Sequence, residues 1–230
     1  MTGHAEPVLL AASHGTASSS GQQAIAALIA EVATRMPETE IATAYVDVQA
    51  PDVPSALARV APDRPVIIVP LLLSAGYHVH VDLARAAAGR AGTRVAAPLG
   101  PDPRLADLLA HRVRSAQAVL PETVILAAAG SSDPRAIEDC RTTADALSQR
   151  LRHPVTTAFL SSGTPSLEDA RQSAGPGAVI VASYLLAPGA FHDAAIARAA
   201  PHPVTPALLD GDRVPAELVE IVADRYHALC

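Results

Sequence analysis

The chain has 230 residues, half of them hydrophobic, which is enough for one large domain or two small ones. Only 3% of the residues are aromatic and Trp is absent, so the core has to be built from Ala, Val, Leu and Ile. The net charge of −6 and the lack of a block rich in Lys and Arg argue against a nucleic-acid partner.

Short apolar runs alternate along the chain with stretches of helical spacing. In the first half, strands are predicted at 8–13, 41–47, 65–71 and 94–97, and helices at 20–35, 54–60, 79–89 and 103–118. In the second half, strands are predicted at 123–129, 155–160, 178–184 and 203–206, and helices at 134–151, 165–173, 190–199 and 214–227. This alternation is typical of an α/β protein whose parallel sheets are covered by helices on both faces.

The two halves repeat the same order of elements. Gly15, after the apolar run that starts at Val8, matches Gly130, after the run that starts at Val124, and Val66 to Gly76 matches Val179 to Gly189. The spacing stays near 113 to 115 residues. A period of this length indicates a duplicated domain and not a solenoid. We therefore predict two tandem doubly wound lobes, at residues 1–120 and 121–230.

No feature of the sequence suggests a membrane or an oxidising compartment. Residues 1–7 contain no Lys or Arg, and the apolar run that follows is about five residues long, too short for the core of a signal sequence. The longest apolar stretch, at 66–73, is far too short to span a bilayer. Cys140 and Cys230 form neither a disulfide framework nor a metal-binding spacing. We expect a cytoplasmic protein.

Two histidine-containing segments follow the first and third predicted strands. His14 comes directly after the first strand, and His78 follows the third after a short loop. In the common strand order 2-1-3-4, strands one and three are neighbours, and a crevice opens where their outgoing connections diverge. Gly15 would allow a sharp turn after His14. The order therefore predicts that the two imidazoles meet, as suits the binding of a divalent metal or proton transfer near neutral pH.

These segments resemble a known family. Ser13-His14-Gly15-Thr16 together with Pro70-Leu-Leu-Leu-Ser-Ala-Gly-Tyr-His-Val-His-Val-Asp82 is similar to the sirohydrochlorin chelatases, the class II tetrapyrrole chelatases, in their long two-lobe form. The resemblance implies insertion of Fe²⁺ or Co²⁺ into sirohydrochlorin, on the way to siroheme or cobalamin. It also implies a cleft between the lobes and no ATP.

Carried over residue by residue, the two histidines of the family fall on His14 and His78. The second half departs from the pattern, because Ala129 stands in the place of His14 and His192 lies one position later than His78. The resemblance therefore places the working site in the first half, with the second half as a degenerate repeat.

The imidazoles of His14 and His78 are predicted to hold the incoming metal and to accept the two pyrrole protons. A neutral imidazole serves either purpose, so the sequence leaves the division of roles open. His80 is a candidate third metal ligand or a solvent-facing residue at the start of the next helix. Asp82 either orients a histidine or favours a helix N-terminus by its charge.

The carboxylates of a tetrapyrrole require a locally basic cleft or one rich in N–H donors, since the protein as a whole is negative. The start of the first helix offers such donors, and Arg85 follows the histidine loop. The candidate tetrapyrrole-binding residues are Thr16, Ser18, Ser19, Ser20 and Arg85.

Other functions remain open at this point. A histidine phosphatase would have Arg before its histidine, where this chain has Ser13, and a non-catalytic carrier of metal or tetrapyrrole would use the same histidines. The chain has no G-x-x-x-x-G-K-[ST], no G-x-G-x-x-G after the first strand and no G-x-S-x-G. We expect no cofactor beyond the substrate metal. The residues do not decide between iron and cobalt. A monomer is compatible with a cleft formed by two lobes of one chain.

Overall fold

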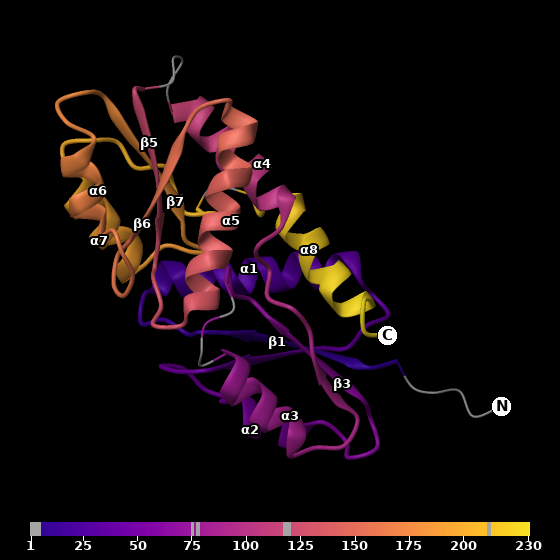
Figure 1. The fold of residues 1–230 in the computed structure, drawn as a ribbon. Helices are drawn as coiled ribbons and strands as arrows, with labels where there is room; N and C mark the ends of the chain where they lie inside the picture. Colours follow the sequence, from indigo (N-terminus) through magenta and orange to yellow (C-terminus); the bar gives the residue numbers. More distant parts are fainter. Residues whose placement is uncertain (1–5, 75, 77–78, 117–120, 211–212) are drawn as a thin grey trace.

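The protein folds into two α/β lobes joined by a layer of helices, as shown by a computed structural model (Figure 1). The structure describes residues 6–74, 76, 79–116, 121–210 and 213–230. The strands are β1 (Val8–Ser13), β2 (Ile41–Tyr45), β3 (Val66–Pro70), β4 (Thr93–Val95), β5 (Thr123–Ala128), β6 (Val155–Phe159) and β7 (Val179–Tyr184). The helices are α1 (Ser19–Arg35), α2 (Val53–Arg59), a π-helical turn η1 (Val79–Leu83), α3 (Ala84–Ala88), α4 (Pro103–Ala116), α5 (Pro134–Leu151), α6 (Leu167–Ser173), α7 (Ala190–Ala199) and α8 (Ala216–His227).

Both sheets are parallel, and both are covered on two faces, as predicted. The sheet of the N-lobe has the order β2-β1-β3-β4, which confirms the predicted order 2-1-3-4. The sheet of the C-lobe has the order β6-β5-β7. In each lobe the first strand lies between the second and the third. The connections that follow the second and third strands therefore leave the sheet on opposite sides of the first strand.

The prediction of a fourth strand in the C-lobe, at 203–206, is wrong. This segment makes only an isolated bridge between Val181 and Val204. The Val181 N–H donates to the Pro203 carbonyl and the Thr205 N–H donates to the Val181 carbonyl, at 2.9 and 2.8 Å. Pro203 and Pro206 have no N–H group of their own, so the ladder cannot extend in either direction. The helix predicted at 79–89 is likewise divided into η1 and α3.

A single apolar core joins the inner faces of the two sheets. Alternate residues of β1 point to opposite faces, so Leu9 contributes to this shared core while Leu10 packs in a separate outer core beneath α2. The strand β5 repeats the arrangement with Val124 on the inner face. The helices α1, α4, α5 and α8 supply many of the other residues of the shared core, which therefore spans both lobes.

Two of these helices pack away from the sheet of their own half. The helix α4 packs against α5 and β7 of the C-lobe, and α8 packs against α1 and β3 of the N-lobe (Figure 1). The hydroxyl of Tyr226, in the last turn of α8, donates to the Pro7 carbonyl at 2.6 Å. The lobes are thus held together by exchanged helices. The predicted boundary at 120/121 falls beside residues outside the described ranges and stays a prediction.

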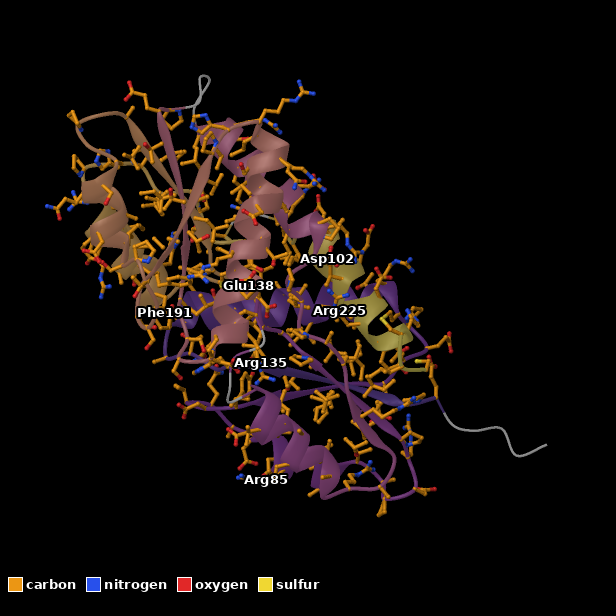
Figure 2. The ribbon with its side chains drawn as sticks, in the orientation of Figure 1. Arg85, Asp102, Arg135, Glu138, Phe191 and Arg225 are labelled. Carbon is orange, nitrogen blue, oxygen red and sulfur yellow. The ribbon has the colours of Figure 1, made fainter. Side chains whose placement is uncertain are left out.

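A buried carboxylate fixes α8 to the N-lobe. Asp102 accepts from Arg104 Nε at 2.9 Å and from Arg225 Nη2 at 3.3 Å, and Arg225 also donates to the Pro98 carbonyl at 2.8 Å (Figure 2). Burial by itself would raise the pKa of Asp102, but the hydrogen bonds and charge of Arg104, with the charge of Arg225, outweigh burial and lower the pKa below its usual range. Asp102 is therefore charged at neutral pH.

No helix of the described chain is long and apolar enough to cross a membrane.

We expect Asp102→Asn to lower the free energy of unfolding at pH 7 by about 1–3 kcal/mol, because the arginines lose a charged acceptor in a buried place. A carboxylate with a lowered folded pKa stabilises the protein above its unfolded pKa of about 3.9, and this contribution is lost as the pH falls through the folded pKa. The difference between wild type and variant, measured by urea unfolding, should therefore shrink at acidic pH.

The control is Asp107→Asn. Asp107 is an exposed residue of α4 that pairs with Arg150 of α5. Exposed ion pairs contribute little, so this variant should stay within about 0.5 kcal/mol of wild type. An equal loss in both variants would contradict the role of Asp102.

Candidate functional site

The site predicted around His14 lies at the carboxyl end of the N-lobe sheet. His14 follows β1 directly, its side chain is exposed, and its carbonyl accepts the Asp47 N–H at 2.9 Å. The strand β3 pairs beside β1, and the Leu71 N–H donates to the Ala12 carbonyl at 2.8 Å. The segment that leads toward His78 therefore starts next to the end of β1, as the predicted strand order requires.

His78 and the side chain of His80 lie outside the described residues, so the meeting of the imidazoles stays a prediction. The backbone of His80 lies in η1, which begins at Val79. Among the described residues there is no group of three or more His, Cys, Asp or Glu side chains arranged to hold a metal ion.

The turn after His14 requires glycine. Gly15 has φ +93°, and a Cβ atom there would overlap the carbonyl oxygen of Asp47. Gly130, its counterpart after β5, has φ +94°, and a Cβ atom there would overlap the carbonyl oxygen of Ser162. The same turn is thus built twice, which confirms the predicted role of Gly15 and fits a duplicated fold.

The hydroxyl residues after Gly15 shape the start of α1. Ser18 caps the helix, since its Oγ accepts the Gly21 N–H at 3.3 Å and lies 2.9 Å from Ser20 Oγ. Thr16 Oγ1 accepts the Ser18 N–H at 3.1 Å. Ser19 and Ser20 are exposed in the first turn, where backbone N–H groups face outward. The predicted carboxylate-binding residues Thr16 and Ser18 to Ser20 therefore lie together, in the loop after His14 and the first turn of α1.

The C-lobe meets the N-lobe at these same loops. A Cβ atom on Gly189, which precedes α7, would lie 3.4 Å from Thr16 Oγ1 and 3.5 Å from Ser18 Cβ. In the reciprocal position, a Cβ atom on Gly76 would lie 3.7 Å from Ser131 Oγ. In each lobe the loop after the central strand thus contacts the loop after the third strand of the other lobe. The carboxyl ends of the two sheets face each other, with the His14 loop between them.

Arg85 lies apart from this loop. It lines a surface hollow of about 870 Å³ between α2 and α3, together with Tyr45, Asp52 and Asp82. Figure 2 shows Arg85 at the end of the N-lobe that is remote from the C-lobe. Neither His14 nor any described residue of the C-lobe lines the hollow. The structure therefore does not bring Arg85 together with Thr16 and the serines.

Two residues of the C-lobe that the sequence analysis did not select lie near the facing edges. Arg135 is in the first turn of α5, its side chain is 63% exposed, and it pairs with the buried Asp133 at 2.8 Å. Phe191 is in the first turn of α7, directly after Gly189 and Ala190, and is 48% exposed (Figure 2). A signal was available, because matching Gly76 to Gly189 places Phe191 opposite His78.

The remaining histidine and cysteine of this region are buried. His192 Nδ1 lies 3.1 Å from Ser183 Oγ, and burial lowers the pKa of this imidazole. Burial raises the pKa of the Cys140 thiol to about 12, so it stays protonated at neutral pH. His192 is thus a buried residue held beside Ser183.

Comparison with known proteins identifies one family. The sequence model of the CbiX family matches residues 8–116 and again residues 123–226. Among solved structures, SirB from Bacillus subtilis with Fe³⁺ is similar at a TM-score of 0.75 and 18% identity, over 97% of this chain and 95% of that one. CbiX, described as the terminal enzyme for biosynthesis of siroheme in denitrifying bacteria, is similar at a TM-score of 0.68 and 25% identity, over 94% and 98%. No curated protein matches the sequence significantly.

We expect Gly15→Ala to destabilise the protein by about 2–4 kcal/mol, because alanine adds both an unfavourable φ and an overlap with the Asp47 carbonyl. Gly175→Ala is the control, since Gly175 has φ +73° but a Cβ atom there would meet nothing within 4 Å. That variant should lose about 1 kcal/mol, from backbone strain alone. Thermal unfolding of both variants measures the difference, and equal losses would exclude a steric requirement at Gly15.

Proposed function

The chain belongs to the CbiX family, and on this premise we propose that it is a sirohydrochlorin chelatase, which inserts Fe²⁺ or Co²⁺ into sirohydrochlorin for siroheme or cobalamin. The observation that carries the proposal is the exposed His14 at the carboxyl edge of the N-lobe sheet, facing a second lobe of the same fold. The solved relatives support it, because SirB from Bacillus subtilis is described with Fe³⁺ and a SirB chelatase with cobalt.

The reaction exchanges two protons for one metal ion. The divalent metal enters the macrocycle, two pyrrole N–H groups lose their protons, and no electron is transferred. We propose that His14 and His78 bind the incoming metal through imidazole nitrogen and accept the protons, with His80 as a third candidate ligand. Imidazole suits both Fe²⁺ and Co²⁺, and a small number of such ligands lets the metal leave again.

The tetrapyrrole would lie between the facing edges of the two sheets. The exposed first turn of α1, with Thr16 and Ser18 to Ser20, offers N–H and hydroxyl donors to its carboxylates. Arg135 adds a guanidinium from the opposite lobe; its pairing with Asp133 uses two of its five N–H donors. Phe191 adds an exposed aromatic ring suited to the apolar face of a macrocycle.

Both facing edges come from one polypeptide, so a monomer is sufficient for the proposed reaction. We further propose that the substrate metal is the only metal required, that no nucleotide takes part, and that the protein acts in the cytoplasm. Arg85 remains a candidate carboxylate-binding residue only for a tetrapyrrole that extends to the hollow beside α3.

We expect His14→Ala to lower the rate of metal insertion at least about 100-fold, since a positioned proton acceptor typically contributes that much or more. The measurement is anaerobic incubation with sirohydrochlorin and Fe²⁺ or Co²⁺, followed by absorbance and corrected for uncatalysed insertion. His111→Ala, which changes an exposed histidine on α4, should behave as wild type. A near-normal rate in the His14 variant would remove His14 from the mechanism, and tight stoichiometric binding without turnover in wild type would indicate a carrier.

We expect Arg135→Gln to raise the KM for the tetrapyrrole about tenfold with little change in the KM for the metal, because the residue contacts carboxylates and not the reacting nitrogens. Arg150→Gln is a matched control, since Arg150 is also paired with an aspartate but lies at the other end of α5. Steady-state kinetics with each substrate varied in turn separate the effects. Similar KM values in both variants would refute a role for Arg135.

A further inference from the structure

The described backbone that follows β3, at residues 71–74 and 76, is held by two sets of contacts in succession. The first set belongs to the N-lobe itself. The Leu71 N–H donates to the Ala12 carbonyl, and the Leu72 carbonyl accepts the Leu99 N–H, both at 2.8 Å. These bonds continue the register of the sheet for two residues beyond β3 and end there.

The second set comes from the C-lobe. The Leu73 carbonyl accepts the hydroxyl of Tyr184 at 2.8 Å. The next residue, Ser74, faces the buried thiol of Cys140 on α5, and Gly76 lies against Ser131. Leu73, Ser74 and Gly76 are therefore each in contact with side chains of the opposite lobe.

Tyr184 is held in place for this contact. It is the last residue of β7, is 2% exposed, and its hydroxyl also accepts from Thr143 Oγ1 on α5 at 3.2 Å. Burial raises the pKa of Tyr184 well above its usual range, so the hydroxyl keeps its proton and remains a donor. A Cβ atom on Gly100 would overlap both the Tyr184 hydroxyl and the Leu73 carbonyl, so glycine is required for the two groups to meet.

The duplication shows that this hydroxyl is particular to the second half. Matching Gly76 to Gly189 places Tyr184 opposite Leu71, which has no polar group to offer. The half that has Ala129 in the place of His14 thus has a buried donor directed at the loop of the other half. An unpaired hydroxyl would be costly in such a buried place, so its bond to Leu73 is strongly specified.

We propose that Tyr184 is a positioning residue for metal insertion, which acts from the C-lobe by fixing the backbone at Leu73, where the segment that carries His78 and His80 begins. The proposal rests on the chelatase function proposed above. It assigns the C-lobe an active part in the site of the N-lobe through a contact that is not itself with substrate.

The test compares Tyr184→Phe with Tyr226→Phe. Both tyrosines are buried, and each donates its hydroxyl to a backbone carbonyl of the N-lobe, but Tyr226 bonds to Pro7 at the start of the chain. Both variants keep the aromatic ring, so the loss of thermal stability should be similar. We expect Tyr184→Phe to lower kcat/KM for metal insertion about tenfold and Tyr226→Phe to leave it unchanged.

A second readout uses Co²⁺ alone, titrated into the protein and followed by its visible ligand-field absorption. A displaced histidine loop should weaken Co²⁺ binding several-fold and alter the spectrum in the Tyr184 variant only. Thr143→Val, which leaves the phenol in place but removes its hydroxyl partner, should shift both readouts in the same direction by a smaller factor. If Tyr184→Phe fails to fold, Thr143→Val provides the test in its place.

The outcomes separate the two proposals. Equal insertion rates and identical Co²⁺ titrations in the Tyr184 and Tyr226 variants would overturn the role of Tyr184 while leaving the chelatase function intact. Absence of insertion by wild type would overturn the chelatase function, and the Co²⁺ titration would still decide whether Tyr184 positions the loop.

Discussion

The shared apolar core between the two sheets is the constraint on which the rest of the structure depends. Each sheet needs helices on both faces, and its inner face is covered in part by a helix of the other half, α8 for the N-lobe and α4 for the C-lobe. Separating the lobes would expose these apolar faces to water at about 25 cal/mol for each Å². The carboxyl ends of the two sheets are therefore fixed opposite each other, and the site lies where they meet.

The two lobes differ in the residues at matching places of the duplicated fold. The N-lobe keeps His14 exposed after its central strand, whereas the C-lobe has Ala129 at that place and a buried His192 bonded to Ser183. The C-lobe also has two exposed side chains near the facing edges, Arg135 and Phe191. The macrocycle proposed as substrate has an apolar face and charged carboxylates, which an exposed aromatic ring and a guanidinium suit.

The proposed chemistry fits a site that is open and shaped by backbone. A metal that has to be passed on is served by few and exchangeable ligands, because a closed cage would retain it. The turns at Gly15 and Gly130, the capped start of α1 and the backbone at Leu73 are fixed by close packing and hydrogen bonds. Among the groups proposed to meet substrate, His14, Arg135 and Phe191 are exposed. Precision in such a site comes from the surrounding contacts.

The sequence by itself determined the elements, the order of the N-lobe strands, the duplication and the turn at Gly15, because these follow from local periodicity, from glycine geometry and from the handedness of crossovers. It did not determine which helix covers which sheet, the loss of a fourth strand between Pro203 and Pro206, or the place of Arg85 on the remote side. Only the tertiary structure placed Arg135 and Tyr184 at the junction of the lobes. Periodicity reports which face of its own element a residue occupies, and the segment that packs on that face is chosen by contacts between distant parts of the chain.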